Sequence, residues 1–468
     1  MGTSDRVIVA EDIKIENPSA EIIAYCLSNL VLSNPDYAKK QRMNLWLGDT
    51  PKTICLYEKR ENWLVLPYGT LRDLWPMLHD YLITSAFEGK NEVNFKANVP
   101  LYDYQMIAVQ KMYTAKGGIL QAPAGSGKTQ MGIALAANLG CRTLWLTHTH
   151  DLLKQSYDRA SLYMDEALLG TITEGKINIG RGMTFATVQT LCKLDLQKYR
   201  NTWDCVIVDE CHRICGSPTT VTQFYVVLSN LAARFKYGLS ATVHRSDGMI
   251  RAAFALVGNV QYVVPDEAVK DRIMKVGIYP VQTNVGISRE CLNSDGTLQY
   301  ARLINCLTRD KTRNNIILHT LQNNKQYSSL ILSDRLDHLR SLINALPAEL
   351  RKDAVMIDGK MTSKKGKAER EQALTDMRTG KKKYLFATYA LAKEGLDVPR
   401  LERLYLTTPQ KDYAVVTQSI GRIARTCEGK ADPLVFDFID NAGYLIRAYK
   451  KRCTSYRKAG CYFLEGDQ

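Results

Sequence analysis

The sequence predicts an α/β fold with two parallel β-sheets in succession and a smaller α/β domain before them. From about residue 119 onward, short apolar runs alternate with helical segments, as in parallel strands joined by crossover helices. This alternation pauses at residues 257–285, where Gly and Pro recur, and then starts again. The chain of 468 residues is long enough for about three domains.

Apolar runs of strand length mark each expected sheet. The first sheet is expected to contain the runs at 118–120, 143–147, 183–187, 205–208 and 237–240. The second is expected to contain those at 330–333, 354–357, 384–388, 404–406 and 434–438. Shorter β-like runs at 53–57 and 63–67 lie in front of both sheets. We therefore expect domains at 1–97, 98–262 and 263–440, followed by a basic, aromatic C-terminal tail at 441–468.

Composition and charge exclude several classes of protein. Hydrophobic residues make up 45% of the chain, which excludes a mostly disordered protein. No run approaches the roughly 20 apolar residues of a membrane span, and the first residues contain no signal-peptide core. We therefore expect an intracellular protein without membrane contacts, cytoplasmic in a bacterial or phage-type system, with the nucleus as the alternative. The net charge of +14 predicts a polyanionic partner, most simply nucleic acid, although solubility explains part of it.

A phosphate-binding loop is predicted at residues 122–129, Ala-Pro-Ala-Gly-Ser-Gly-Lys-Thr, between a strand and a helical run. Glycines there let the backbone wrap phosphate oxygens, and the helix N-terminus supplies free N–H groups. Lys128 is expected to reach the β- and γ-phosphates, and the Thr129 hydroxyl is expected to bind Mg²⁺. The residues expected around the nucleotide are Gly125, Ser126, Gly127, Lys128 and Thr129.

Two carboxylates follow the predicted strand at 205–208. Asp209 is expected to hold Mg²⁺, and Glu210 to orient or deprotonate the attacking water. Acidic residues often follow strands only because they are solvated there. The two carboxylates indicate a catalytic site because a P-loop precedes them in the same predicted sheet.

The motifs and their order resemble those of superfamily 2 helicases and translocases of the DExH type. They are the P-loop, Asp-Glu-Cys-His at 209–212, Ser-Ala-Thr at 240–242 and Gln-Ser-Ile-Gly-Arg-Ile-Ala-Arg at 418–425. The sequence is most similar to the branch of XPB-type repair helicases, phage UvsW-like helicases and restriction-enzyme motor subunits. The resemblance covers about residues 99–440. It implies two tandem RecA-like domains that use ATP and Mg²⁺.

The same resemblance implies further nucleotide contacts. Gln105 corresponds to an adenine-recognition residue, although Tyr102 stands where the family usually has Arg, and a surface glutamine is the alternative. Gly395 and Asp397 lie in a segment that faces the nucleotide. Gln418, Arg422 and Arg425, at spacings of four and three, are expected on one helical face. The arginines would act as arginine fingers, and Gln418 would position the water. A solvated basic helix edge is the alternative.

Backbone contacts to nucleic acid are implied at the ends of several strands. The expected residues are Thr147, Thr187 and Arg245 in the first domain, and Ser333 and Thr388 in the second. Hydroxyl groups at these positions suit phosphate contacts. For each threonine a strand-end cap is the alternative, and for Arg245 it is a surface ion pair.

These expectations predict an ATP-dependent DNA helicase or translocase, with 3′-to-5′ movement implied by the branch. The expected partner is single-stranded or forked DNA. The alternatives are an RNA helicase, a nucleotide-switched clamp that does not translocate, and the motor subunit of a restriction or defence complex. Residues 1–97 are expected to bind nucleic acid or a protein partner. The basic tail suits single strands through its tyrosines, with a solvated charged face as the alternative.

Overall fold

The chain folds into two compact units, Met1–Ala268 and Val269–Gln468. The structure, a computed structural model, describes residues 5–87, 93, 95, 97–123, 125–215, 217–243, 248–272, 274–286, 289–293, 298–359, 361, 363–393, 396 and 398–464. The boundary between the units lies six residues beyond the expected start of the second domain at 263.

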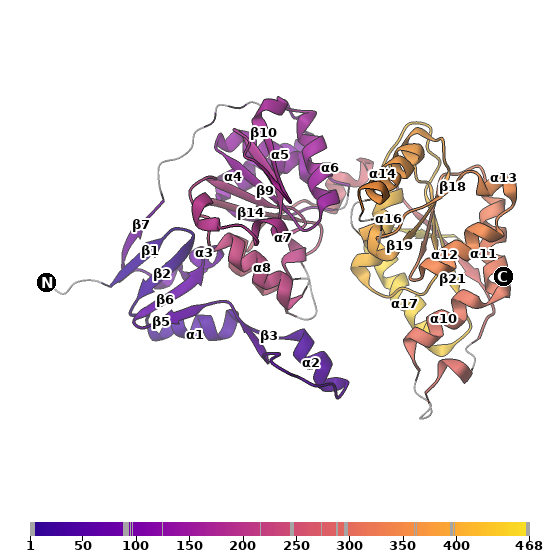
Figure 1. Cartoon of the computed structure of the whole chain (residues 1–468), viewed down its shortest axis with the longest axis horizontal. Helices are drawn as coiled ribbons and strands as arrows, with labels where there is room; N and C mark the ends of the chain where they lie inside the picture. The colour runs from indigo at the N-terminus through magenta and orange to yellow at the C-terminus, as the bar shows by residue number, and fades with distance from the viewer. Residues whose placement is uncertain are drawn as a thin grey trace. The chain divides into compact units, whose positions relative to one another are not determined.

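The first unit is built around an eight-stranded sheet (Figure 1). Its strand order is β11 (Lys176–Asn178), β10 (Leu169–Thr173), β12 (Met183–Thr187), β9 (Thr143–Thr147), β13 (Cys205–Val208), β14 (Phe235–Ser240), β8 (Gly118–Gln121) and β15 (Val260–Val263). Every neighbouring pair is parallel except β10 with β11. All five strands predicted for this sheet are confirmed. Every residue of β9, β12 and β13 is buried, as expected for parallel strands covered on both faces.

The first helix of this domain precedes β8, and the other helices lie between strands of the sheet. The helices are α4 (Asp103–Ala115), α5 (Lys128–Leu139), α6 (His150–Ser161), α7 (Val188–Leu191), α8 (Pro218–Leu228) and α9 (Ile250–Val257). All residues from Met131 to Ala136, and Leu139, are buried in α5, so the helix after the P-loop is anchored in the core.

The N-terminal segment forms a separate mixed sheet but shares its core with the larger one. The strand order is β5 (Glu58–Arg60), β6 (Trp63–Pro67), β2 (Asp12–Glu16), β1 (Arg6–Val9) and β7 (Leu82–Ser85). Apolar side chains of this sheet and of α1 (Ala20–Asn29) belong to one continuous cluster with those of α8 and α9. Lys236 Nζ joins the two parts by donating to Glu11 O at 2.9 Å and Leu228 O at 2.7 Å. The segment is therefore docked onto the first RecA-like domain.

The second unit contains a seven-stranded sheet in which every neighbouring pair is parallel. The order is β18 (Ala354–Met356), β19 (Tyr384–Thr388), β17 (Ser329–Ser333), β20 (Arg403–Leu406), β21 (Leu434–Ile439), β16 (Gly277–Gln282) and β22 (Tyr462–Phe463). Its main helices are α10 (Tyr300–Arg309), α11 (Lys311–Asn323), α12 (Leu336–Ala345), α14 (Lys364–Thr379), α15 (Tyr389–Lys393), α16 (Tyr413–Ile423) and α17 (Gly443–Lys458). The five strands predicted for this sheet are confirmed, and the fold is that of two tandem RecA-like domains.

The predicted C-terminal tail is instead an integral part of the second unit. Residues 443–458 form α17, and β22 pairs with β16. Arg452 is buried, and its Nε and Nη2 each donate to a carboxylate oxygen of Asp437 at 2.8 Å. Tyr456 is buried as well and donates to the same carboxylate at 2.7 Å. These two side chains complete a core, so they do not form a stacking surface for single strands.

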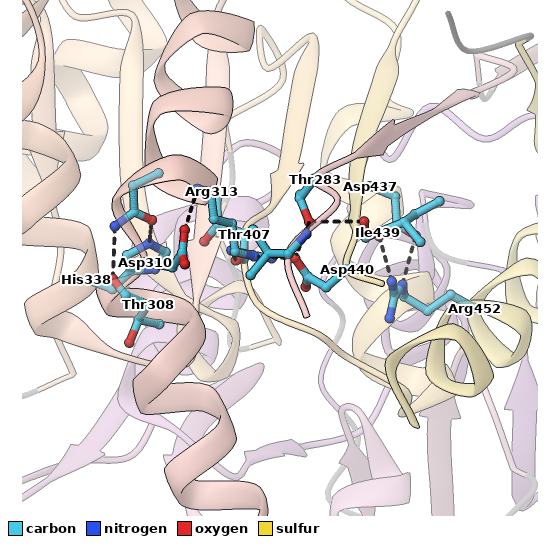
Figure 2. A network of polar contacts seen from close by, with 12 residues as sticks. Thr283, Thr308, Asp310, Arg313, His338, Thr407, Asp437, Ile439, Asp440 and Arg452 are labelled. Atoms are coloured by element: carbon cyan, nitrogen blue, oxygen red, sulfur yellow. Dashed lines mark hydrogen bonds and ion pairs between the residues drawn. The ribbon is translucent and has the colours of Figure 1, made fainter. Parts of the chain in front are cut away.

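A second buried charge pair fixes the carboxyl ends of three strands in this unit (Figure 2). Arg313 on α11 has no exposed surface; its Nε donates to Asp440 Oδ1 at 2.7 Å and its Nη1 to Thr407 O at 2.6 Å. Thr283 Oγ1 donates to the same Asp440 oxygen at 2.6 Å. Because a buried charge is stable only when it is paired, this network holds the loops after β16, β20 and β21 in fixed positions.

Candidate functional site

The P-loop has the backbone that phosphate binding requires. It connects β8 to α5, and Gly127, with φ of 80°, is the N-cap of that helix. This φ lies in the left-handed region, which favours glycine, and a Cβ there would lie 2.4 Å from Gln105 Nε2 and 2.7 Å from Gln130 Oε1, so both glutamine side chains would have to shift. Gly125 also has a positive φ, of 84°. The free N–H groups of the first turn of α5 therefore follow a loop with no side chains in the way at these positions.

Sheet order brings the two predicted carboxylates to the P-loop. β13 and β8 are both neighbours of β14, so the residues after β13 and β8 emerge at the same edge of the sheet. Lys128 Nζ lies 3.8 Å from Glu210 Oε1 and donates to Ala122 O at 3.4 Å. The structure thus places Lys128, Asp209 and Glu210 in one site, as the sequence predicts.

Asp209 is a buried carboxyl group, and the positive charge near it is too small to offset the effect of burial on its pKa. Burial, followed by the neighbouring Glu210 carboxylate, raises its pKa to about 7, while Lys128 and Ser156 oppose this shift. Ser156 Oγ donates to Asp209 Oδ2 at 3.2 Å. A divalent cation would restore the ionised form, and carboxylate and hydroxyl oxygens are the donors that Mg²⁺ prefers. Asp209 and Thr129 therefore fit a Mg²⁺ ion, and Ser126 Oγ, buried without a partner among the described residues, offers one more oxygen at the loop.

Glu210 is held in a strained backbone conformation. Its φ of 48° lies in the left-handed region, which costs a non-glycine residue of order 1–3 kcal/mol. Its backbone N–H donates to Asp209 Oδ1 at 3.0 Å. Such strain persists only where surrounding contacts maintain it, and it clusters at functional sites.

A polar chain leads from the P-loop to the segment after β14. His212 Nδ1 lies 3.2 Å from Glu210 Oε2 and 3.1 Å from Ser240 Oγ. Ser240 Oγ in turn donates to Thr242 O at 2.7 Å. Both residues lie in motifs named from the sequence, Asp-Glu-Cys-His at 209–212 and Ser-Ala-Thr at 240–242, but the contact between His212 and Ser240, 28 residues apart, was not predicted.

Gln105 is buried against the P-loop, so it is not a surface glutamine. Its Nε2 donates to Ser126 O at 2.8 Å, and its Oε1 accepts from Tyr102 N at 3.0 Å. Tyr104 Oη donates to the same Ser126 carbonyl at 2.9 Å. The structure assigns Gln105 a role in fixing the P-loop, while an adenine contact stays a prediction.

Burial contradicts direct nucleic-acid contacts for some of the predicted hydroxyl groups. Thr147 and Ser333 have no exposed surface. Thr147 Oγ1 donates to Thr149 O at 3.1 Å, and Ser333 Oγ lies 3.0 Å from His338 Nδ1. Thr187 is also buried and caps α7 by accepting from Thr190 N. These three side chains shape the loops after their strands, which was the alternative for the threonines.

Of the remaining predicted contacts, Thr388 at the end of β19 is half-buried. Arg245, Gly395 and Asp397 lie outside the described residues.

Helix α16 contains only two of the three residues Gln418, Arg422 and Arg425, which were predicted to share one helical face. It ends at Ile423, so Gln418 and Arg422 share a helix while Arg425 lies beyond it, and the expected common face is wrong for Arg425. Arg422 Nε donates to Ala392 O at 2.9 Å and its Nη1 to Leu396 O at 3.2 Å. Gln418 Oε1 is buried without a partner among the described residues. Arg422 thus holds the chain after α15.

Lys430 is a residue that the sequence did not single out. Its ammonium group donates to three carbonyl oxygens, at 2.7 Å to Ile423 and Arg425 and at 2.9 Å to Pro399. It therefore closes the end of α16 and fixes the backbone at Arg425.

A cavity of about 430 Å³ lies elsewhere in the first unit, between Tyr68, Trp75, Val257 and Gln261. Gly118, the first residue of β8, lines it, whereas the P-loop follows the last residue of that strand. The cavity is therefore separate from the nucleotide site.

Two family models match parts of the chain that contain these motifs. Residues 98–245 match the type III restriction enzyme res subunit, and residues 312–427 match the helicase conserved C-terminal domain. The chain belongs to the superfamily 2 helicases.

Some relatives of this helicase are named as RNA helicases and others as DNA helicases or translocases. A relative from Acanthamoeba polyphaga mimivirus carries the name of an ATP-dependent RNA helicase; it is 26% identical over 74% of this chain and 65% of its own length. The DNA 3′-5′ translocase XPB2 of Sulfurisphaera tokodaii is 26% identical over 77% of this chain and 84% of its own length. A relative named as a helicase in Escherichia phage T5 is 27% identical over 73% of this chain and 72% of its own length.

Solved structures share the fold of this helicase. Dbp5 of S. cerevisiae, bound to RNA and ADP, has a TM-score of 0.56 at 15% identity and covers 85% of this chain and 94% of its own. An HsdR subunit fragment of a type I restriction enzyme from Vibrio vulnificus has a TM-score of 0.55 at 17% identity, covering 92% and 80%. Among the described residues, no helix has the length and apolar character needed to cross a membrane.

Proposed function

We propose that this helicase hydrolyses ATP in response to DNA and uses the hydrolysis to move along DNA or separate its strands. The observation that carries the proposal is the continuous polar chain from Lys128 through Glu210 and His212 to Ser240. It connects the phosphate-binding loop with a segment after another strand of the same sheet, which supports a link between hydrolysis and movement.

The chain's own residues suggest how hydrolysis proceeds. Lys128 binds the phosphates, and this exchanges its contact with Glu210 for one with the substrate. Glu210 is then free to orient the attacking water and accept its proton. Thr129 and Asp209 would hold a Mg²⁺ ion, which would supply neutralising charge to the phosphates. For the second unit, Gln418, Arg422 and Arg425 remain our candidates for contacts with the transition state, and Gly395 and Asp397 for contacts with the nucleotide.

DNA is proposed as the polymer because the motifs resemble a branch that acts on DNA. The excess of basic residues, net +14, supports a nucleic acid without distinguishing DNA from RNA. RNA is the second candidate, and the name of the mimivirus relative favours it.

ATP turnover tests this proposal when it is measured with no polymer, single-stranded DNA, duplex DNA, forked DNA and RNA. We expect the largest stimulation with single-stranded or forked DNA. Lys128→Ala and Glu210→Gln should lower the stimulated rate by about 10²- to 10⁴-fold, while Lys198→Ala, at an exposed lysine, should leave it unchanged. Turnover that no polymer stimulates would exclude the proposal, and slow turnover without strand displacement would favour a nucleotide-switched clamp.

A further inference from the structure

The first unit carries an arm whose base is closed by a short ladder. β3 (Val31–Ser33) pairs with β4 (Thr53–Cys55) in antiparallel register, and residues 34–52 between them form the arm. Asn34 closes the base: its N–H donates to Lys52 O at 3.0 Å and its Nδ2 to Pro51 O at 2.7 Å. Its Oδ1 also caps α2 (Pro35–Arg42) by accepting from Asp36 N at 2.9 Å.

The arm is ordered without contributing to a core. No residue of α2 is buried, and Figure 1 shows this helix at the far end of β3, away from the N-terminal sheet. An eight-residue helix is marginal without packing, so its caps matter. Lys40 Nζ donates to Thr50 Oγ1 at 2.6 Å, and Leu45 N donates to Lys40 O at 2.9 Å. These bonds give the tip of the arm a defined shape.

The tip presents a tryptophan that is held in place and yet exposed. Trp46 is 87% exposed, beside exposed Met43 and Leu45. A Cβ on Gly48 would lie 2.9–3.3 Å from three atoms of the Trp46 ring, so the ring rests on bare glycine backbone. Gly48 also has a φ of +50°, which favours glycine. Exposed apolar side chains that gather at one place, as Met43, Leu45 and Trp46 do here, mark an interaction surface.

Cations without carboxylate partners accompany this ring. Lys39, Arg42 and Lys52 are exposed, and within the part of the chain that the structure describes none of them forms an ion pair. Protein–protein interfaces are depleted in lysine, whereas grooves for single-stranded nucleic acid combine basic residues with aromatic rings on which bases stack. The composition of the arm therefore favours nucleic acid.

We propose that the arm binds an unpaired nucleic-acid strand, with a base stacked on Trp46 and phosphates near Lys39, Arg42 and Lys52. Bases of an intact duplex are already stacked on one another, so a duplex engages only the cations, and the arm prefers single-stranded or forked substrates. This proposal rests on the proposed function only in that the motor acts on nucleic acid.

Fluorescence anisotropy with the full chain tests the proposal, using labelled oligothymidylate, a fork and a blunt duplex. Trp46→Ala should weaken binding of the single strand and the fork by about 5- to 150-fold, the range for loss of one stacked base, with little effect on the duplex. Trp75→Ala is the matched control, because Trp75 is also exposed, at 58%, in the same N-terminal segment. A Lys39→Ala, Arg42→Ala double variant should make the plot of log affinity against log salt shallower by about 1.4 for the single strand.

The ATP turnover measured without polymer reports whether each variant is folded, since the arm lies outside the nucleotide site. Equal affinity of Trp46→Ala and the parent for all three nucleic acids would overturn the proposal. Loss of self-association in Trp46→Ala, seen by sedimentation, together with unchanged nucleic-acid binding, would overturn it in favour of a protein interface. If no polymer stimulates turnover in the parent but Trp46→Ala still weakens single-strand binding, the proposed role of the arm is supported and the proposed motor function is excluded.

Discussion

At the scale of single residues, the nucleotide site depends on one carboxylate with two neighbours. Glu210 contacts Lys128 through one oxygen and His212 through the other. Its strained φ of 48° sets this position. A change in what Lys128 binds is therefore passed to Glu210, and through His212 to Ser240.

Replacing His212 should separate hydrolysis from its stimulation by polymer. In His212→Ala the hydrogen bond to Ser240 and the close contact with Glu210 are both lost, at a cost of about 0.5–1.5 kcal/mol for the hydrogen bond. We expect the DNA-stimulated rate to fall about 2- to 13-fold, with turnover in the absence of DNA little changed. Steady-state kcat with and without DNA measures this, with His150→Ala at an exposed site as control. An equal fall in both rates would show that His212 serves hydrolysis alone.

Lys430 gives the second unit a pH-sensitive position. Burial lowers its pKa to about 8, and as the pH rises through this value the group loses one of the three donors that hold Pro399, Ile423 and Arg425. We expect kcat to decline above about pH 8 in the parent. In Lys430→Met, kcat should be about ten- to hundredfold lower and this decline absent, with KM for ATP little affected. The control is Lys451→Met on the exposed face of α17; an unchanged pH profile in Lys430→Met would contradict the assignment.

At the scale of elements, the sequence predicted the buried strands and missed the marginal ones. Central strands such as β9 and β13 are fully buried, so they read as continuous apolar runs. Edge strands such as β11, with three exposed residues, and β22 leave no such pattern. The end of α16 was missed as well, because Lys430, several residues later, closes the helix through its side chain.

Side-chain direction at strand ends was not predictable either. The sequence placed Thr147 and Ser333 correctly at the ends of β9 and β17. Their hydroxyl groups turn inward because Thr149 O, in the loop after β9, and His338 Nδ1, on α12, lie within reach. A local pattern contains no information about such partners.

The docking of the N-terminal sheet should depend on pH through Lys236. Burial lowers its pKa from 10.5 to about 7, so between these values the unfolded chain binds more protons, and this group makes stability rise with pH. Lys236→Met should remove this contribution, up to about 1.4 kcal/mol per pH unit. Near pH 10 the variant should be about 1–3 kcal/mol less stable, because two carbonyl groups lose their donor. Urea unfolding at several pH values measures both effects. If the free energy of unfolding rises with pH as steeply in Lys236→Met as in the control Lys193→Met, this prediction is contradicted.

At the scale of the whole molecule, the cores predict that the two units unfold as separate cooperative bodies. The cluster that contains β8, β9, β13 and the N-terminal sheet lies within the first unit, and those around β17 and β19 lie within the second. A chain with separate cores does not unfold in one step. Calorimetry should therefore resolve two transitions.

Nucleotide identifies which transition belongs to which unit. The P-loop, Asp209 and Glu210 all lie in the first unit, so ATP with Mg²⁺ at about 100 times Kd should stabilise that transition by about 2.7 kcal/mol. The midpoint temperature of the other transition should rise less. Lys128→Ala should abolish the rise that nucleotide causes in the first transition. Scans of the separate segments 1–268 and 269–468 would assign the transitions, because only the first should respond to nucleotide. If both transitions of the full chain rise equally while segment 1–268 alone does not respond, then nucleotide binding needs the second unit, and the first unit does not hold a complete binding site.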